Sequence, residues 1–341
     1  MLTHPVHFSC PSEAVWPELL TNAPSRIDGE RLSRISGGML SSWIIRTCYE
    51  LRLRGAEVSI GPGFRRGAIN LASVRDLGRR SRDPLAFVVI PRGDAHDPAL
   101  ADFTVEQNRQ RPATPHRASM THWPQPGLRP RDAARGARID TVSYKGRVLN
   151  LDAGFRAQAF RDALAAEDIG FEIDAFEGLR GQHDWNDYRT ADAVLAVRNL
   201  TLADAAGKPA SKLINAWGGD LPALLGPEPA YRELRQSPLD FIEVRTPVQA
   251  IAALRGLKAE PNRYLAMIDA GRKRRVEVSE DRIAAQWVAL LNGPIAAAFL
   301  RWQRRSRSET LLRHALRCVR EPLNKRRYLA AIQAGPRLLD G

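Results

Sequence analysis

The sequence predicts two α/β domains, each built on a parallel sheet. Strand-like and helix-like stretches alternate along the chain, a pattern typical of parallel sheets whose faces are covered by helices. The chain has 341 residues. A chain of this length is usually too long for a single hydrophobic core, so two domains are expected. A stretch at 108–138 contains five prolines and little periodicity, which predicts an extended linker between the two halves.

The first half, residues 1–138, is expected to form the first domain. Short apolar runs predict strands at Val6–Cys10, Glu57–Ile60 and Leu85–Ile90. A helix is expected to begin at Ser41 or Ser42 and to end at Gly55, because apolar residues recur on one side of this stretch.

The second domain is expected at 139–293, and its alternation of elements is more regular. Strands are predicted at Thr141–Tyr144, Gly170–Ile173, Ala193–Val197, Pro222–Leu225 and Phe241–Val244. Helices are predicted at Phe155–Ala166, Trp185–Thr190, Ser211–Trp217, Ala230–Gln236, Pro247–Leu257, Pro261–Val276 and Asp281–Leu291. Five strands with intervening helices indicate a doubly wound domain.

The bulk composition restricts the class of protein. The first residues lack the pattern of a signal peptide, and no stretch is expected to reach the roughly eighteen apolar residues of a membrane span. The three cysteines are odd in number and far apart, which argues against a disulfide framework or a zinc site and favours a reducing, cytoplasmic compartment. The formal net charge is +13, which favours nucleic acid, an anionic membrane or a phosphate-bearing substrate as partner.

The segment from Lys208 to Glu233 contains a candidate anion site. Ser211 stands where a helix should begin and could cap it, and Lys212 follows at once. The first turn of a helix offers free N–H groups and the positive end of its dipole, so this start suits a diphosphate. The alternative is that Ser211 is only a cap and Lys212 only a solvated charge.

A second cation is expected at the same place. The apolar run that begins at Asp192 predicts a buried strand with Arg198 at its carboxyl end, the edge where open α/β sheets bind ligands. The other interpretation pairs Arg198 with a nearby acid such as Asp204.

The segment SKLINAW-x-G-x-LPALLG resembles the donor-binding stretch of GT-B glycosyltransferases. VSYKG and DYRTADAVLAVR resemble the opening strand and the strand before the donor site in the same domain, so the resemblance covers 141 to about 291. It implies two Rossmann-like domains, a nucleotide-sugar donor and diphosphate contacts from Lys212 and Arg198. The first half resembles the acceptor domain only in outline.

The sequence departs from this pattern at one point. Many retaining members carry two glutamates, but the matching positions here are Gly207 and Asn215. Asn215 could still bind a ribose or sugar hydroxyl. The absence of these two glutamates argues against retaining stereochemistry. It also leaves open the alternative that the protein is a catalytically inactive scaffold with this fold.

Three more residues belong to the expected donor site. Gly226 follows a strand and permits close approach of a ligand, while Glu228 and Tyr231 would face the sugar. In the alternative, Pro229 begins a helix and Glu228 favours its dipole.

Asp94 is the candidate catalytic base, because it follows the buried strand at 85–90 and inverting transfer needs a group that accepts the acceptor's proton. The alternative is a solvated turn residue, because aspartates are common in turns. Asp102 and His122 are weaker candidates for the base. No Asp-x-Asp pair is present, so metal-independent transfer without a cofactor is expected.

The residues at 294–341 are expected to form basic C-terminal helices. From 295 to 341 there are eleven Arg or Lys and three Asp or Glu. Docking on the first domain is the expected arrangement, and peripheral contact with the inner face of a membrane is the alternative.

The function expected from these observations is transfer of a sugar from a nucleotide-diphosphate donor to an unidentified acceptor hydroxyl, in polysaccharide or glycoconjugate synthesis. A sugar-nucleotide epimerase would need more acids and histidines near the donor. A nucleic-acid-binding protein would use the positive charge, but no nucleic-acid-binding motif is present.

Overall fold

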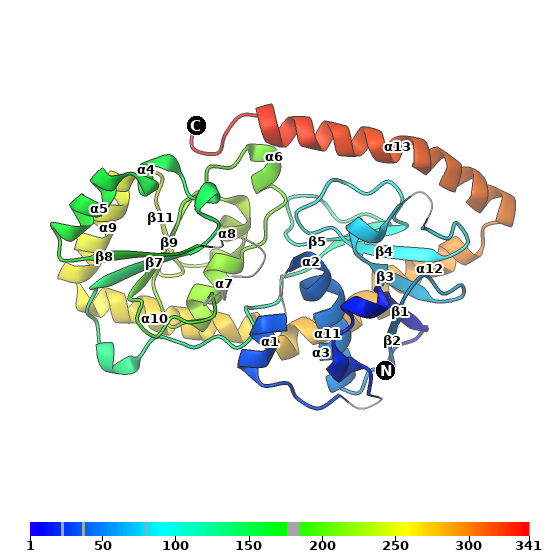
Figure 1. The fold of residues 1–341 in the computed structure, drawn as a ribbon, viewed down its shortest axis with the longest axis horizontal. Coiled ribbons are helices and arrows are strands. Elements are labelled where there is room, and N and C mark those ends of the chain that lie inside the picture. The colour runs from blue at the N-terminus through cyan, green and yellow to red at the C-terminus, as the bar shows by residue number, and fades with distance from the viewer. Residues whose placement is uncertain (22–23, 36–37, 79–80, 176–184, 341) are drawn as a thin grey trace. The chain divides into compact units, whose positions relative to one another are not determined.

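The computed structural model describes residues 1–21, 24–35, 38–78, 81–175 and 185–340 (Figure 1). The chain forms two compact units, each with its own sheet. Unit 1 contains Met1–His122, Gly207–Pro209 and Glu280–Ala334, and unit 2 contains Trp123–Ala206, Ala210–Ser279 and Gly335–Gly341. The division therefore falls after His122 rather than after 138, and before Glu280 rather than at 294.

Unit 1 contains a six-stranded sheet in the order β2-β1-β3-β4-β5-β6, and every pairing is parallel. The strands are β1 (Val6–Ser9), β2 (Ser59–Gly61), β3 (Ile69–Ala72), β4 (Phe87–Pro91), β5 (Phe103–Glu106) and β6 (Arg117–Ser119). The predicted strands correspond to β1, β2 and β4. The other three, β3, β5 and β6, were not predicted from the sequence.

Helices from both ends of the chain pack within unit 1. They are α1 (Gly29–Ile35), α2 (Gly38–Leu40), η3 (Ser41–Ile45), α3 (Arg46–Leu53), α11 (Glu280–Leu290), η7 (Leu291–Ile295), α12 (Ala296–Gln303) and α13 (Arg307–Ala334). The rings of Trp43 in η3 and Trp287 in α11 lie 6.3 Å apart at their centroids. Phe299 of α12 meets Phe87 of β4 at 5.4 Å. These contacts explain why α11 belongs with unit 1 and not with the second sheet.

One stretch of these helices contradicts the expectation that no segment is long and apolar enough to span a membrane. Between Pro261 and Gln303 the helices contain an 18-residue window whose length and hydropathy would suit a membrane span. Within the structure, 44% of that window is buried. Ile283, Trp287 and Phe299 are among its buried side chains, so this stretch contributes to the core of unit 1.

Unit 2 contains a five-stranded parallel sheet in the order β11-β10-β9-β7-β8. The strands are β7 (Thr141–Gly146), β8 (Gly170–Ala175), β9 (Ala193–Ala196), β10 (Ala223–Leu225) and β11 (Ile242–Glu243). The helices are α4 (Ala153–Arg156), α5 (Gln158–Ala165), α6 (Leu202–Ala205), α7 (Ser211–Gly218), α8 (Pro229–Leu234), α9 (Pro247–Ala259) and α10 (Pro261–Glu277). All five predicted strands are present.

The helix predicted at Trp185–Thr190 is wrong, because these residues form turns and an isolated bridge. The predicted linker is also only partly irregular, since it includes β6. Its last part is held by Asp192, a fully buried carboxylate just before β9. Asp192 accepts hydrogen bonds from Arg131 at 2.8 Å and from Arg135 at 2.7 Å. These two ion pairs hold the segment against unit 2.

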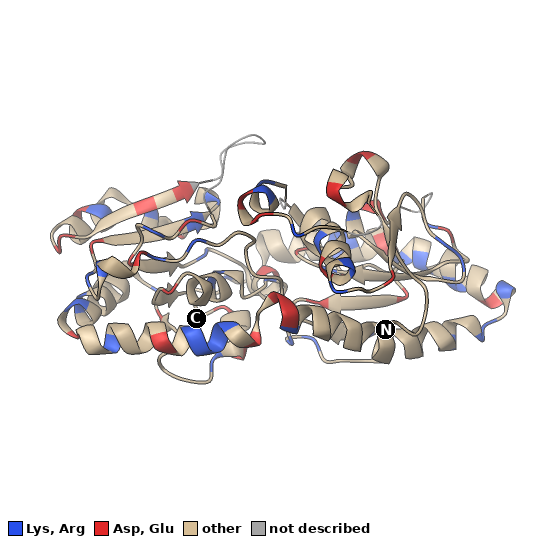
Figure 2. Cartoon of the chain, turned by 90° about the horizontal axis from the view of Figure 1, so that it is seen from below, with Lys and Arg blue, Asp and Glu red and all other residues tan. Residues whose placement is uncertain are grey.

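Basic and acidic residues are interspersed over both units in the view of Figure 2. Many of the Arg side chains form ion pairs, and some of these pairs are deeply buried. Arg46, for example, meets Glu50 at 3.5 Å and Glu280 at 3.3 Å. A large part of the positive charge is therefore balanced locally.

Candidate functional site

The strand order of unit 2 reverses at one point along its sheet. Along the chain β7 precedes β8 and β9, yet β7 lies between these two strands in the sheet. The connections from β7 and from β9 therefore leave in opposite directions, which is the switch point where doubly wound sheets bind ligands. Gly146 ends β7, and Arg198 follows two residues after the end of β9. These two residues therefore lie at the carboxyl edge of the sheet, beside the switch point.

Lys212, in the first turn of α7, extends to the same edge. Its Nζ donates a hydrogen bond to the carbonyl oxygen of Lys145 in β7. The ring centroids of Trp185 and Tyr144 lie 5.0 and 6.0 Å from the same nitrogen. The part of the chain that the structure describes contains no carboxylate in an ion pair with Lys212. Among the described residues the ammonium therefore has aromatic and carbonyl groups as its immediate neighbours.

This environment lowers the pKa of Lys212 from 10.5 to about 7. Burial of the ammonium is the largest cause, because desolvation disfavours the charged form. The positive charges of Arg198 and Lys145 act in the same direction, and Glu228 opposes them. Lys212 and Arg198 are therefore close enough to influence each other electrostatically.

Arg198 is held in a buried ion pair with Glu228. Its Nε donates to Glu228 at 2.7 Å and its Nη2 donates to the other carboxylate oxygen. The Nη2 also lies 3.4 Å from the hydroxyl of Tyr231. Arg198 therefore pairs with an acid, as the alternative interpretation expected, and this acid is Glu228 from the loop after β10.

The positions of Glu228 and Tyr231 correct the expectation that they face a sugar. Both residues are fully buried, with 0% of their surface exposed. Burial raises the pKa of Tyr231, so its hydroxyl stays protonated. In this structure the two side chains orient Arg198 instead of facing an open site.

The other three residues predicted for the donor site, Ser211, Asn215 and Gly226, have different surroundings in the structure. Ser211 does not cap α7, because Ala210 occupies the cap position and no side chain makes a cap hydrogen bond. Asn215 is buried, and its side-chain oxygen accepts from the backbone N–H of Gln125 at 3.0 Å, which gives it a structural role. Gly226 donates from its N–H to Ala196 at 2.9 Å, and a Cβ there would only make ordinary contacts with Val197.

Sequence reasoning missed the contribution of β7. A Cβ on Gly146 would lie 2.8 Å from the Tyr144 hydroxyl and 3.4 Å from Lys212 Nζ, so only glycine lets these two side chains pack this close to β7. Lys145 pairs with Asp174 at the end of β8, and its Nζ lies 5.0 Å from the Tyr188 ring centroid. The VSYKG segment was the available signal, but its position beside β9 depends on the sheet order.

In unit 1, Asp94 follows β4 at the carboxyl edge of the sheet. It is exposed, and its carboxylate accepts from Gln107 at 2.8 Å and from Lys208 at 3.1 Å. Lys208 belongs to the short segment at 207–209 that is part of unit 1. Asp94 is thus an exposed turn residue, as the alternative interpretation expected, and two side chains donate to its carboxylate.

The two weaker candidates for the catalytic base, Asp102 and His122, make contacts within unit 1. Asp102 is buried and binds Arg82 and Arg317, each at 2.5 Å, and the backbone N–H of Val88 at 3.0 Å. His122 packs edge-on against Trp43, with ring centroids 5.0 Å apart. Asp102 therefore serves the core of unit 1.

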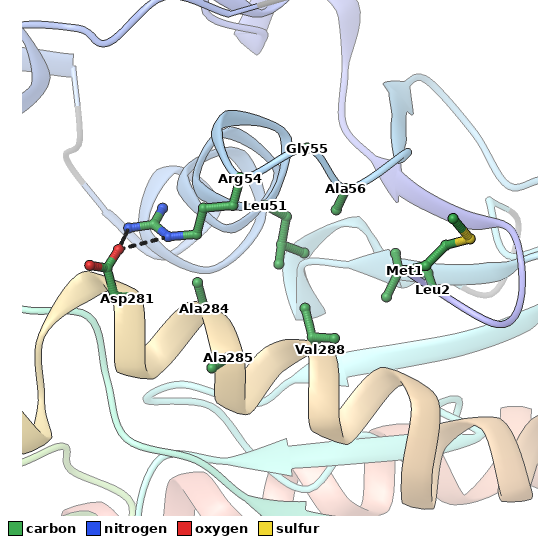
Figure 3. Close-up of a pocket in the computed structure, with 10 residues that line it drawn as sticks. All are labelled: Met1, Leu2, Leu51, Arg54, Gly55, Ala56, Asp281, Ala284, Ala285 and Val288. Atoms are coloured by element: carbon green, nitrogen blue, oxygen red, sulfur yellow. Dashed lines mark hydrogen bonds and ion pairs between the residues drawn. The ribbon is translucent and has the colours of Figure 1, made fainter.

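Unit 1 also contains a pocket of about 370 Å³ between α3 and α11 (Figure 3). Its walls are mainly apolar, with Leu51, Ala284 and Val288 prominent, and Arg54 and Asp281 form an ion pair of 2.6 Å at one side. None of the predicted site residues lines it. Across the described ranges, no group of three or more His, Cys, Asp or Glu side chains could hold a metal ion.

Comparison with solved structures decides the fold. Sucrose-phosphate synthase from Thermosynechococcus elongatus superposes with a TM-score of 0.54 over 86% of this chain and 100% of that chain, at 11% identity. The chain has the GT-B fold. This assignment confirms the predicted architecture of two Rossmann-like domains with a C-terminal helix.

Two other solved structures are less similar to the chain than sucrose-phosphate synthase is. AviGT4, a glycosyltransferase involved in avilamycin A biosynthesis, is 16% identical over 86% of this chain and 98% of that chain, with a TM-score of 0.49. TarM is 8% identical with a TM-score of 0.46, and the chain spans 55% of its length. No protein-family profile and no characterised protein matches the sequence.

Proposed function

We propose that this chain is a glycosyltransferase that moves a sugar from a nucleoside-diphosphate donor to an acceptor hydroxyl. The observation that carries the proposal is the convergence of Lys212 and Arg198 at the switch-point edge of unit 2. A GT-B fold alone would leave the chemistry open, because folds host many functions. Lys212 and Arg198 at this edge favour an anionic ligand such as a diphosphate, although Glu228 already pairs with the guanidinium.

The chemical role of these cations follows from the reaction. When the bond between the sugar and the diphosphate breaks, negative charge builds up on the leaving phosphate. Lys212 and Arg198 would stabilise that charge without a metal ion, and Glu228 would keep the guanidinium oriented. Gly146 would let Tyr144 and Lys212 pack against the end of β7, which keeps the ammonium at this edge of the sheet.

The remaining parts of the proposal concern the acceptor. Asp94 is proposed as the base that takes the acceptor's proton, and an inverting reaction in polysaccharide or glycoconjugate synthesis fits the absence of the paired glutamates. Gln107 and Lys208 would hold its carboxylate in one orientation. We also propose metal independence and a cytoplasmic location.

The test is calorimetric titration of the full chain with uridine, guanosine, adenosine and thymidine diphosphates. At least one is expected to bind, and Lys212→Met is expected to weaken binding by about tenfold to a hundredfold, the value of a charged hydrogen bond. Lys273→Met is the matched control, because Lys273 is an exposed lysine in the same unit. Failure of all four to bind at millimolar concentration would refute the donor site.

Turnover is measured separately, as release of the nucleoside diphosphate from a panel of nucleotide sugars with a mixed acceptor extract. Release that depends on Lys212 supports the enzyme. Binding without any turnover across the panel would instead identify a scaffold that kept the donor site and lost catalysis.

A further inference from the structure

The long helix α13 docks on unit 1 through its polar face. Arg317 pairs with Asp102 at 2.5 Å, and Glu321 pairs with His96 at 2.5 Å. Asn324 and Tyr328 donate to backbone carbonyls of the loop after β4, at 3.1 and 3.3 Å. A docked amphipathic helix usually turns its apolar face inward, and α13 does the reverse.

The opposite face of α13 presents an apolar stripe to solvent. The stripe consists of Leu312, Leu316, Val319 and Leu323, which are 63%, 52%, 64% and 45% exposed. Their spacing of four, three and four residues places them on one side of a helix. Val319 and Leu323, together with Pro322 and Arg326, also line a surface hollow.

Basic residues flank this stripe. Arg313, Arg320, Arg326 and Arg327 are all exposed and lie beside it on the helix. From Arg307 to Ala334 there are seven Arg or Lys and two Asp or Glu. An apolar stripe bordered by arginines is the pattern of a helix that lies in the interface of a bilayer.

We propose that α13 is a docking surface for an anionic bilayer, with the apolar stripe inserted among the lipids and the flanking arginines on their headgroups. The charge decides between this occupant and a second copy of the chain. Two such helices would bring like charges together, whereas an anionic surface complements them. The stripe covers eleven residue steps, or about 17 Å of helix, which is short for a stable coiled coil.

The test is flotation of the full chain with vesicles of phosphatidylcholine alone or of phosphatidylcholine with phosphatidylglycerol. The chain is expected to float with the anionic vesicles, less so at high salt, and not with the neutral ones. Leu316→Gln/Val319→Gln is expected to reduce binding by about tenfold or more, since each side chain loses its burial. Arg320→Gln/Arg327→Gln is expected to reduce it by about fivefold for each charge removed.

Matched variants in unit 2 control for nonspecific effects. Val248→Gln/Val276→Gln removes two similarly exposed apolar side chains, and Arg263→Gln/Lys273→Gln removes two exposed charges. Both are expected to float like the wild type. Circular dichroism melts check that all variants stay folded, as surface changes should.

Three outcomes would overturn the proposal. The wild type could fail to bind anionic vesicles at low salt, or the stripe variant could bind as well as the wild type. Light scattering could also show a dimer that the stripe variant alone converts to monomers, with vesicle binding unchanged; the stripe would then be an interface between copies. Vesicle binding needs no nucleotide sugar, so these results are independent of the proposed transfer.

Discussion

Lys212, in the first turn of α7, donates a hydrogen bond from its side chain to the carbonyl oxygen of Lys145 in β7. The two residues are 67 positions apart in sequence. The contact brings an ammonium to the end of the strand that borders the switch point. A carbonyl oxygen can accept from either the charged or the neutral amine, so the contact holds the side chain in place across a wide pH range.

Diphosphate affinity is expected to fall as pH rises above 7. The pKa of Lys212 is lowered to about 7 by burial and by the charges of Arg198 and Lys145. Above this pH the amine must take up a proton before it can pair with the phosphate. The loss approaches tenfold per pH unit, because one proton is linked to binding.

Calorimetry between pH 6.5 and 9 in buffers of different ionisation enthalpy measures this proton uptake directly. Lys212→Met should show weaker binding with little dependence on pH over this range. Equal proton uptake by wild type and variant would rule out Lys212 as the titrating group.

Lys212 should also make the ligand-free protein more stable as pH rises. The unfolded chain keeps the lysine proton up to about 10.5, whereas the folded chain releases it around pH 7. The free-energy penalty that buried Lys212 imposes on folding is therefore largest below pH 7. This penalty diminishes between pH 7 and pH 10.5. Urea unfolding between pH 7 and 9, before tyrosines titrate, should show a rising midpoint. The midpoint for Lys212→Met should change less.

Breaking the Arg198–Glu228 pair from one side is expected to destabilise the protein. Glu228→Leu leaves a buried guanidinium without a partner, at a cost of about 3–5 kcal/mol. The double variant Arg198→Met/Glu228→Leu should recover most of this loss, because apolar side chains can replace a buried ion pair. Chemical denaturation of the two single variants and the double variant measures the coupling energy. Additive losses would contradict the buried pair.

A methyl group at position 146 is expected to disturb the site locally. Gly146→Ala places Cβ 2.8 Å from the Tyr144 hydroxyl and 3.4 Å from Lys212 Nζ. We expect a stability loss of about 1–3 kcal/mol from overpacking and weaker diphosphate binding.

Adding Tyr144→Phe removes the clashing hydroxyl and should restore part of both losses. Gly256→Ala is the control, because no atom lies within 4 Å of its Cβ position. Denaturation and calorimetry together measure the two effects. Unchanged stability and binding in Gly146→Ala would mean that this space is not confined.

Two aspartates of unit 1 should respond differently to the same change. Asp94→Asn keeps the shape of an exposed residue, so stability should change little while transfer falls by about 10²–10⁴-fold if it is the base. Asp102→Asn removes a charge buried between Arg82 and Arg317, so the melting temperature should fall markedly. A melting curve and an activity assay for each variant separate the two roles. Normal turnover by Asp94→Asn would remove it from the mechanism.

Much of the architecture could be read from local pattern. Apolar runs bounded by turn residues located the five strands of unit 2, and periodicity located α7, α9 and α10, because these signals depend on neighbours in sequence. The same signals missed β3, β5 and β6. Length alone is not the reason, because the equally short β2 and β10 were predicted. It also misplaced a helix at Trp185–Thr190, where the chain forms turns.

The sequence by itself determined that Arg198 would follow a buried strand and that Lys212 would stand at the start of a helix. The tertiary structure decided that they share one edge with Gly146, and that Glu228 rather than Asp204 pairs with Arg198. The physical reason is that local pattern reports burial along one segment but not the order of strands in a sheet. That order arises from packing of the whole unit, and it alone brings residues from β7, β9 and the loop after β10 together.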